Sequence, residues 1–250
     1  MSGKQIRLLD DSEWPASAFE VRLPISRERA ALGVIDMQHY CIGAREHLAH
    51  TVQRHSQELH EEYAKRVASV IENIGKLLSV FRTSKRRVFY TRHGIQLPDA
   101  GDLVERRRGR ERVALAATGG RSGHMAVRGT PGYEIIRELA PLPDELVLDK
   151  NTSSAFHSTP LDLFLRNMNV DTVILTGIAS DQCVFATALD AADRGFHVII
   201  AADACANLDP GSAEAVQILF GRVFGYVMRT SAILEWLATG NEPRETRITA

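Results

Sequence analysis

The chain has 250 residues, of which 44% are hydrophobic and 24% charged, and its 30 Lys and Arg against 31 Asp and Glu leave a formal net charge of −1. This length allows one large α/β domain or two small ones, and the composition is that of a soluble globular protein. No apolar run approaches the ~18 residues that span a bilayer, and the first residues lack the apolar core of a signal peptide. Because the net charge is near zero, we expect neither a nucleic-acid partner nor a membrane partner.

The cysteine content indicates free thiols rather than disulfides. Three cysteines, Cys41, Cys183 and Cys205, are an odd number and too few for a disulfide framework. We therefore expect a reducing, cytoplasmic setting, in which chemistry at a cysteine would be thiol chemistry.

The first half of the chain begins with residues 1–29, which mix charges and prolines without periodicity and are predicted to be an extended arm. Residues 30–35 are a short, continuous apolar run, which is typical of a strand covered on both faces. Residues 59–82 carry apolar side chains at helical spacing and predict a helix, and 87–91 predict a second strand. Residues 92–131 are predicted to be a long loop or insertion.

In the second half of the chain, predicted helices and strands alternate regularly. The helices are predicted at 133–139, 159–167, 180–194 with a cap at Ser180 or Asp181, 212–220 and 231–238, and the strands at 145–148, 172–176, 197–202 and 226–228. Such alternation predicts a parallel sheet with helices on both faces. We expect one domain over 30–240, followed by a tail at 241–250.

Three chemically suited side chains follow three of these strands. Sites in open parallel sheets lie beyond the carboxyl ends of the strands, where Asp36, Lys150 and Cys183 are expected. At the start of a helix, Cys183 would have its thiol pKa lowered by backbone N–H groups that can also receive an oxyanion. Asp36 could take the thiol proton, and Lys150 could hold Asp36 ionised. The alternative is a buried apolar cysteine, a capping aspartate and a surface lysine.

Three motifs resemble the cysteine hydrolases of the isochorismatase-like superfamily: VIDMQ at 34–38, LDKNTSSAF at 148–156 and TGIASDQCVFATALDAADRGF at 176–196. The resemblance implies a three-layer αβα fold of Rossmann type, with a central, mainly parallel six-stranded sheet. It also implies that Asp36 is the base, Lys150 the electrostatic partner and Cys183 the nucleophile. A cis peptide between Ile178 and Ala179 would place the N–H groups of Ala179 and Cys183 as the oxyanion hole.

The departures from the superfamily pattern narrow the expected activity. Members that cleave the isochorismate vinyl ether lack the nucleophilic cysteine, and residues 91–99 lack the two spaced histidines of the nicotinamidase metal cluster. We therefore expect no metal and no cofactor. The long loop and the stretch GTPGYEIIREL at 129–139 resemble the branch that acts on biuret-like, ureidoacrylate-like and carbamoylsarcosine-like compounds.

The predicted function is a cysteine-dependent amidohydrolase that cleaves a linear C–N amide, ureide or N-carbamoyl bond through a thioester and releases ammonia or an amine. A ring-shaped amide is the alternative within this class. The alternatives outside it are a metal-dependent nicotinamidase-type amidase and a catalytically idle binding protein of the same fold.

The surroundings of the site are less well defined by the sequence. The predicted substrate pocket is lined by His39, Tyr40, Cys41, Arg92, Phe156 and Phe220. The arginine-rich run at 105–112 is interpreted as a solvated loop or a subunit contact, or as the source of an arginine that, like Arg92, binds a substrate carboxylate. The resemblance implies a homodimer or homotetramer.

Overall fold

The computed structural model describes residues 23–42, 57–117 and 123–241, so most of the predicted arm and tail lie outside it. Six parallel strands form one sheet in the order β3-β2-β1-β4-β5-β6. The strands are β1 (Ala30–Ile35), β2 (Arg87–His93), β3 (Leu146–Lys150), β4 (Thr172–Ile178), β5 (His197–Ala206) and β6 (Tyr226–Met228). The order of strands reverses between β1 and β4, which is where ligands bind in open sheets of this kind.

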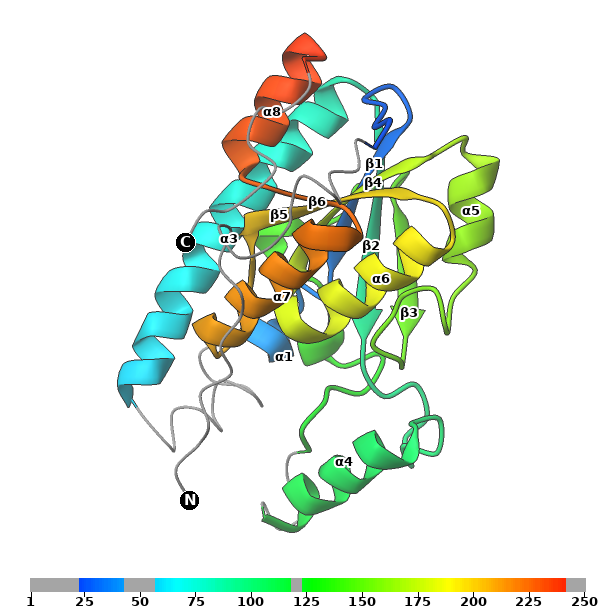
Figure 1. Cartoon of the computed structure of the whole chain (residues 1–250). Coiled ribbons are helices and arrows are strands. Elements are labelled where there is room, and N and C mark those ends of the chain that lie inside the picture. Colours follow the sequence, from blue (N-terminus) through cyan, green and yellow to red (C-terminus); the bar gives the residue numbers. More distant parts are fainter. Residues whose placement is uncertain (1–22, 43–56, 118–122, 242–250) are drawn as a thin grey trace.

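Helices cover both faces of the sheet (Figure 1). One face carries α3 (Gln57–Thr83) and α8 (Thr230–Thr239), and the other carries α5 (Leu161–Asn167), α6 (Phe185–Asp193) and α7 (Pro210–Val223). The short helix α1 (His39–Ile42) follows β1. The predicted three-layer αβα architecture is confirmed. Among the described residues, no helix combines the length and the apolar character needed to cross a membrane.

The first strand shows why its sequence is a continuous apolar run. Leu32 and Val34 pack into the hydrophobic cluster beneath α3 and α8, whereas Ala31 and Ile35 pack into the cluster beneath α5, α6 and α7. Successive side chains of a strand point to opposite faces, so a strand with helices on both sides has no polar face. Burial of each large aliphatic side chain contributes about 1.5–3 kcal/mol. This packing fixes the end of β1, and hence the position of Asp36.

The helix predicted at 133–139 is wrong. The structure has two short 3-10 turns instead, Pro131–Tyr133 and Arg137–Leu139, with extended backbone between them. That extended segment pairs with the chain leaving β1: Gln38 and Ile135 form an antiparallel bridge, and the Ile136 N–H donates to the Met37 carbonyl at 3.0 Å. Pairing with a distant segment therefore overrides the local helical pattern.

The insertion at 92–131 contains a helix, α4 (Glu105–Ala117), which lies beyond the carboxyl ends of the strands (Figure 1). The arginine-rich run, predicted as a loop, forms the first two turns of α4. Arg107 and Glu111 are four residues apart and are both buried. The Glu111 carboxylate accepts hydrogen bonds from the backbone N–H groups of His124 and Met125 at 2.9 and 3.1 Å. These contacts tie α4 to the returning chain.

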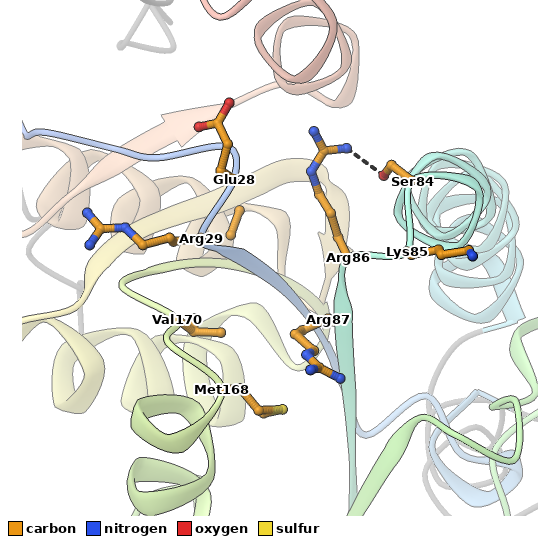
Figure 2. A pocket seen from close by; sticks show the side chains of 9 residues that line it. Glu28, Arg29, Ser84, Lys85, Arg86, Arg87, Met168 and Val170 are labelled. Carbon is orange, nitrogen blue, oxygen red and sulfur yellow. Dashed lines mark hydrogen bonds between the residues drawn. The ribbon is translucent and has the colours of Figure 1, made fainter.

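A cavity of about 330 Å³ lies at the opposite, amino-terminal edge of the sheet (Figure 2). Arg29, Arg86 and Arg87 line it, but their side chains extend in different directions (Figure 2). Arg29 is ion-paired with Asp171, and Arg86 donates to the Arg27 carbonyl at 2.9 Å. The cationic groups therefore do not converge on one point, and none lies near Asp36.

Candidate active site

The carboxyl ends of three strands bring Asp36, Lys150 and Cys183 together. Asp36 follows β1, Lys150 ends β3, and Cys183 lies in the turn after β4. The Lys150 ammonium donates to Asp36 Oδ2 at 2.7 Å, and the charges of both groups act on the pKa of the Cys183 thiol. All three residues are buried, with exposed fractions of 2%, 0% and 7%. A buried lysine and aspartate at this distance form an ion pair that the surrounding protein screens little.

The Asp36 carboxylate is held from two sides. Thr91 on β2 donates its hydroxyl to Asp36 Oδ1 at 2.6 Å, while Lys150 binds Oδ2. The backbone of Asp36 has a φ of 51°, in the left-handed region that Asp and Asn tolerate better than most residues. Lys150 is held in turn by the carbonyls of Thr152 and Ser153, at 3.1 and 3.2 Å. Both charged groups are thus fixed before any substrate binds.

A close approach of two strands shapes the turn that carries Cys183. Gly177 has a φ of 107°, and a Cβ there would lie 2.1 Å from the Ile35 carbonyl oxygen of β1. Glycine is therefore required at this position. The next peptide bond, between Ile178 and Ala179, is cis. A single π-helical turn, Ser180–Val184, follows and places Cys183 just before α6.

This turn differs from the predicted helix start. The expected side-chain cap at Ser180 or Asp181 is absent: Ala179 occupies the cap position with no side-chain hydrogen bond, and the buried Ser180 hydroxyl has no partner among the described residues. Instead, the Val184 N–H donates to the Ala179 carbonyl at 3.2 Å, five residues back. The wider turn sets the position of Cys183.

The pKa of the Cys183 thiol is raised, to about 11, and not lowered as the sequence predicted. Burial is the largest cause, and the neighbouring Asp36 adds to it, whereas the positive charges of Lys150 and Arg107 act in the opposite direction. Burial also lowers the pKa of Lys150, but the charges of Asp36 and Cys183 outweigh it and raise that pKa above its usual value. At neutral pH the resting site therefore holds a thiol and an ammonium, and attack by sulfur requires a base.

The residues predicted to line the substrate pocket are distributed differently. Tyr40 is buried with its hydroxyl 2.9 Å from His93 Nδ1, Cys41 is half-buried beside it, and His39 is exposed. Phe156 and Phe220 belong to the hydrophobic cluster that also contains Cys183. They form part of the packed core on that face.

Arg92 does not join Asp36, Lys150 and Cys183. The alternation of β2 places Arg92 on the face opposite to Thr91 and His93. Its guanidinium pairs with Asp149 at 2.8 Å and with Glu134 at 2.7 Å, so its charge is already neutralised. The prediction that Arg92 lines the pocket is therefore not supported.

Three polar residues around the site have no role predicted from the sequence: Gln38, Thr91 and Ser153. Arg107 enters the prediction only as one of the arginines of the run at 105–112, and His93 only as part of the stretch 91–99. The side-chain oxygen of Gln38 accepts from the His93 backbone N–H at 2.7 Å, and its amide nitrogen donates to the Tyr133 carbonyl at 2.6 Å. Two signals in the sequence point to such residues. Gln38 belongs to the VIDMQ motif, and Thr91 and His93 alternate at the end of β2, on the face that Asp36 adjoins.

The side chains around the site bear on whether it could bind a metal ion. The parts of the chain that the structure describes contain no group of three His, Cys, Asp or Glu side chains that could hold a metal ion. His93 lies in the stretch 91–99, where nicotinamidases carry their metal cluster, and both of its ring nitrogens have partners. Nδ1 lies 2.9 Å from the Tyr40 hydroxyl, and Nε2 lies 2.7 Å from Arg107 Nη1.

Comparison with known families agrees with this geometry. The isochorismatase domain matches residues 30–232, and the chain belongs to the isochorismatase family. A cysteine hydrolase from Pseudomonas syringae pv. phaseolicola has a similar structure, with a TM-score of 0.70 and 27% identity over 88% of this chain and 98% of its own. N-carbamoylsarcosine amidase from Thermoplasma acidophilum is also similar, with a TM-score of 0.60 and 28% identity over 81% and 96% of the two chains.

Curated relatives carry amidohydrolase and amidase names. Ureidoacrylate amidohydrolase from Methylorubrum extorquens is 35% identical over 104 residues, which are 40% of this chain and 42% of the relative. Nicotinamidase 3 from Arabidopsis thaliana is 29% identical over 175 residues, 68% of this chain and 81% of the relative. The chain thus spans about two fifths of the length of the ureidoacrylate amidohydrolases that it matches.

Proposed function

We propose that the protein is a cysteine-dependent amidohydrolase that cleaves a linear C–N bond of a small amide, ureide or N-carbamoyl compound. The observation that carries this proposal is the buried constellation of Asp36, Lys150 and Cys183 at the point where the strand order reverses. It supplies a nucleophile, a base and a cation that holds the base. The relatives named as a ureidoacrylate amidohydrolase and an N-carbamoylsarcosine amidase support the same class of bond.

The raised thiol pKa defines the first step. Because Cys183 is protonated at neutral pH, its proton moves to Asp36 as the sulfur attacks the carbonyl carbon. The S–C bond forms, and the carbonyl π electrons move to oxygen. We propose that the backbone N–H groups of Ala179 and Cys183 receive this oxyanion, and that Lys150 keeps Asp36 oriented throughout.

The second half of the proposed reaction returns the enzyme to its resting state. Protonated Asp36 gives its proton to the leaving nitrogen, the C–N bond breaks, and ammonia or an amine departs from a thioester on Cys183. Asp36 then removes a proton from water, which attacks the thioester carbonyl. The C–S bond breaks, the proton returns to sulfur, and the acid is released.

The test is ammonia or amine release from a panel of ureides, N-carbamoyl amino acids and simple amides, nicotinamide included. Cys183→Ala should abolish release, and Cys183→Ser should leave it at least about 100-fold slower. Cys205→Ala is the matched control, because it removes another buried thiol that has no role in the mechanism. A covalent adduct on Cys183, seen by mass spectrometry after rapid quenching, would identify the intermediate. Full activity in Cys183→Ala would refute the covalent mechanism.

The nicotinamidase-type alternative is supported by the relative named nicotinamidase 3 and is tested in the same assay. Nicotinamide hydrolysis that disappears with a chelator and returns with added zinc would establish it. Binding of these compounds with no turnover would instead establish the idle binding protein.

A further inference from the structure

Arg107 is a buried cation that has no counter-ion among the residues that the structure describes. Its exposed fraction is 9%, and no carboxylate of the described residues forms an ion pair with it. Its guanidinium has five N–H donors. Nη1 contacts His93 Nε2 at 2.7 Å, Nη2 donates to Ser153 Oγ at 2.8 Å, and the buried Nε has no partner. Burial of an unpaired charge is costly, so such a group is kept where an anion completes it.

This guanidinium lies beside the catalytic groups. Ser153 connects the two: its hydroxyl accepts from Arg107, and its carbonyl accepts from Lys150 at 3.2 Å. His93, the other partner of Arg107, pairs with Lys150 across β2 and β3. The charge of Arg107 also acts on the pKa of Cys183. Arg107 is thus two hydrogen bonds from the ammonium that holds the base.

The side chains that hydrogen-bond directly to Lys150 and Arg107 include one carboxylate for the two cations. Lys150 and Arg107 are cations, and Asp36 is the only carboxylate paired with either of them among the described residues. His93 does not add charge, because burial and the neighbouring cations hold its pKa well below the usual value. The Cys183 thiol is neutral at pH 7. A bound molecule with one negative charge would give Arg107 the ion-pair partner that the described residues do not supply.

We propose that Arg107 is a specificity-determining residue that binds a carboxylate of the substrate, so that the enzyme acts on ureido or N-carbamoyl acids and discriminates against neutral ureides. This inference rests on the proposed function. The planar guanidinium fits a carboxylate through paired N–H donors, one of which would be the unpartnered Nε–H. The carbamoyl carbonyl of the same molecule would lie at Cys183.

The neighbouring arginines of α4 have other roles. Arg108 and Arg112 pair with Glu105, and the side chain of Arg112 is 63% exposed. Arg110 is exposed and has no ion pair among the described residues, so it is a matched control on the same helix. Arg106 is exposed but also reaches Ser153 Oγ, at 3.3 Å, and is therefore unsuitable as a control.

The test compares substrates that differ only in charge. The N-carbamoyl derivatives of glycine, β-alanine and γ-aminobutyrate are each assayed beside the alkylurea of the same chain length. The wild type should prefer the best acid by roughly 100-fold or more in kcat/KM, as expected for a buried charge pair. Arg107→Met should reduce this preference to about 3-fold or less, mainly by slowing the acid. Arg107→Lys should retain part of the preference, and Arg110→Gln should retain all of it.

Each other outcome counts against one part of the proposal. A wild type that hydrolyses alkylureas as well as acids, or an Arg107→Met variant that slows both alike, refutes the specificity role and leaves the proposed function intact. If Arg107→Met does not fold, the preference of Arg107→Lys for the acid over the alkylurea decides whether Arg107 sets the specificity. If no compound is hydrolysed, the proposed function fails, and the binding of an N-carbamoyl acid then decides whether Arg107 forms an anion site. N-carbamoylglycine should then raise the melting temperature of the wild type and not of the Arg107 variant, and equal shifts would refute the anion site.

Discussion

The hydroxyl of Thr91 lies 2.6 Å from Asp36 Oδ1, on the side of the carboxylate opposite to Lys150. Thr91 comes from β2, the strand between those that carry the base and the lysine. It is a positioning residue, because it acts on a substrate only through Asp36. Its hydrogen bond leaves the carboxylate one preferred orientation toward the thiol.

Thr91→Val removes this hydrogen bond while keeping the shape of the side chain. A hydrogen bond to a charged group contributes about 1.5–3 kcal/mol, and we expect kcat to fall by roughly 10- to 100-fold with little change in KM. Thr91→Ser should restore most of the rate, because it returns the hydroxyl. Steady-state kinetics with the best substrate would measure both. A rise in KM with kcat unchanged would show that Thr91 supports substrate binding instead.

The buried pair of Asp36 and Lys150 should show strong coupling in stability. Lys150→Met leaves a buried carboxylate unpaired, and Asp36→Asn leaves a buried ammonium unpaired, so each should lower the free energy of unfolding by about 3–5 kcal/mol. The double variant should lose much less than the sum, because no buried charge is left alone. Urea unfolding of the four proteins measures this cycle. Additive losses would contradict direct pairing.

The raised pKa of Cys183 has a direct consequence for chemical labelling. Because only the thiolate reacts, alkylation of Cys183 by iodoacetamide should accelerate about tenfold per pH unit above pH 7 and level off near pH 11. In the unfolded protein, the labelling rate should level off at a pH well below 11, near the ordinary thiol pKa of ~8.5. Peptide mass spectrometry distinguishes Cys183 from the other cysteines. Rapid labelling at pH 7 that does not change with pH would mean that the resting enzyme holds a thiolate.

His93 should make the folded state sensitive to mild acid. Its pKa is lowered by burial first, and then by the charges of Lys150 and Arg107, so the folded protein keeps it neutral. Below the unfolded pKa of 6.5, the unfolded chain binds a proton that the folded chain does not. Stability should therefore fall as the pH drops below about 6.5, by up to about 1.4 kcal/mol per pH unit.

The variant His93→Gln tests this prediction, because glutamine keeps a hydrogen-bonding side chain but cannot titrate. Its free energy of unfolding should change less between pH 6.5 and 5 than that of the wild type. Urea titrations at each pH provide the comparison. Identical pH dependence in the two proteins would assign the acid sensitivity to other groups.

The sheet could be predicted from local patterns because its central strands, β1 and β4, are buried on both faces. An apolar run such as 30–35 has one interpretation when turn residues bound it, and β1 begins and ends as predicted. The ends of such strands are chemically informative, which is why Asp36, Lys150 and Cys183 could be singled out. The helix predicted at 133–139 failed because a bridge to Gln38, almost a hundred residues away, stabilises extended backbone.

Arg107 could not be distinguished from its neighbours for a similar reason. The run at 105–112 contains five arginines, and their spacing alone does not define which of them faces inward. That depends on where α4 begins and on its contacts with His93, at the end of β2, and with Ser153, in the loop after β3. The thiol pKa was mispredicted because the sequence indicates a helix start but not the depth at which Cys183 is buried.

The three reactive groups are supplied by segments far apart in the chain: Asp36 and Lys150 are separated by 114 residues, and Cys183 comes from a third strand end. Loop closure over such distances is slow, because its entropic cost precedes the contacts that offset it. During refolding, helix content should therefore recover before hydrolysis does. Recovery of activity would then report completion of the sheet, and a fragment ending before β4 would contain the base and the lysine without a nucleophile.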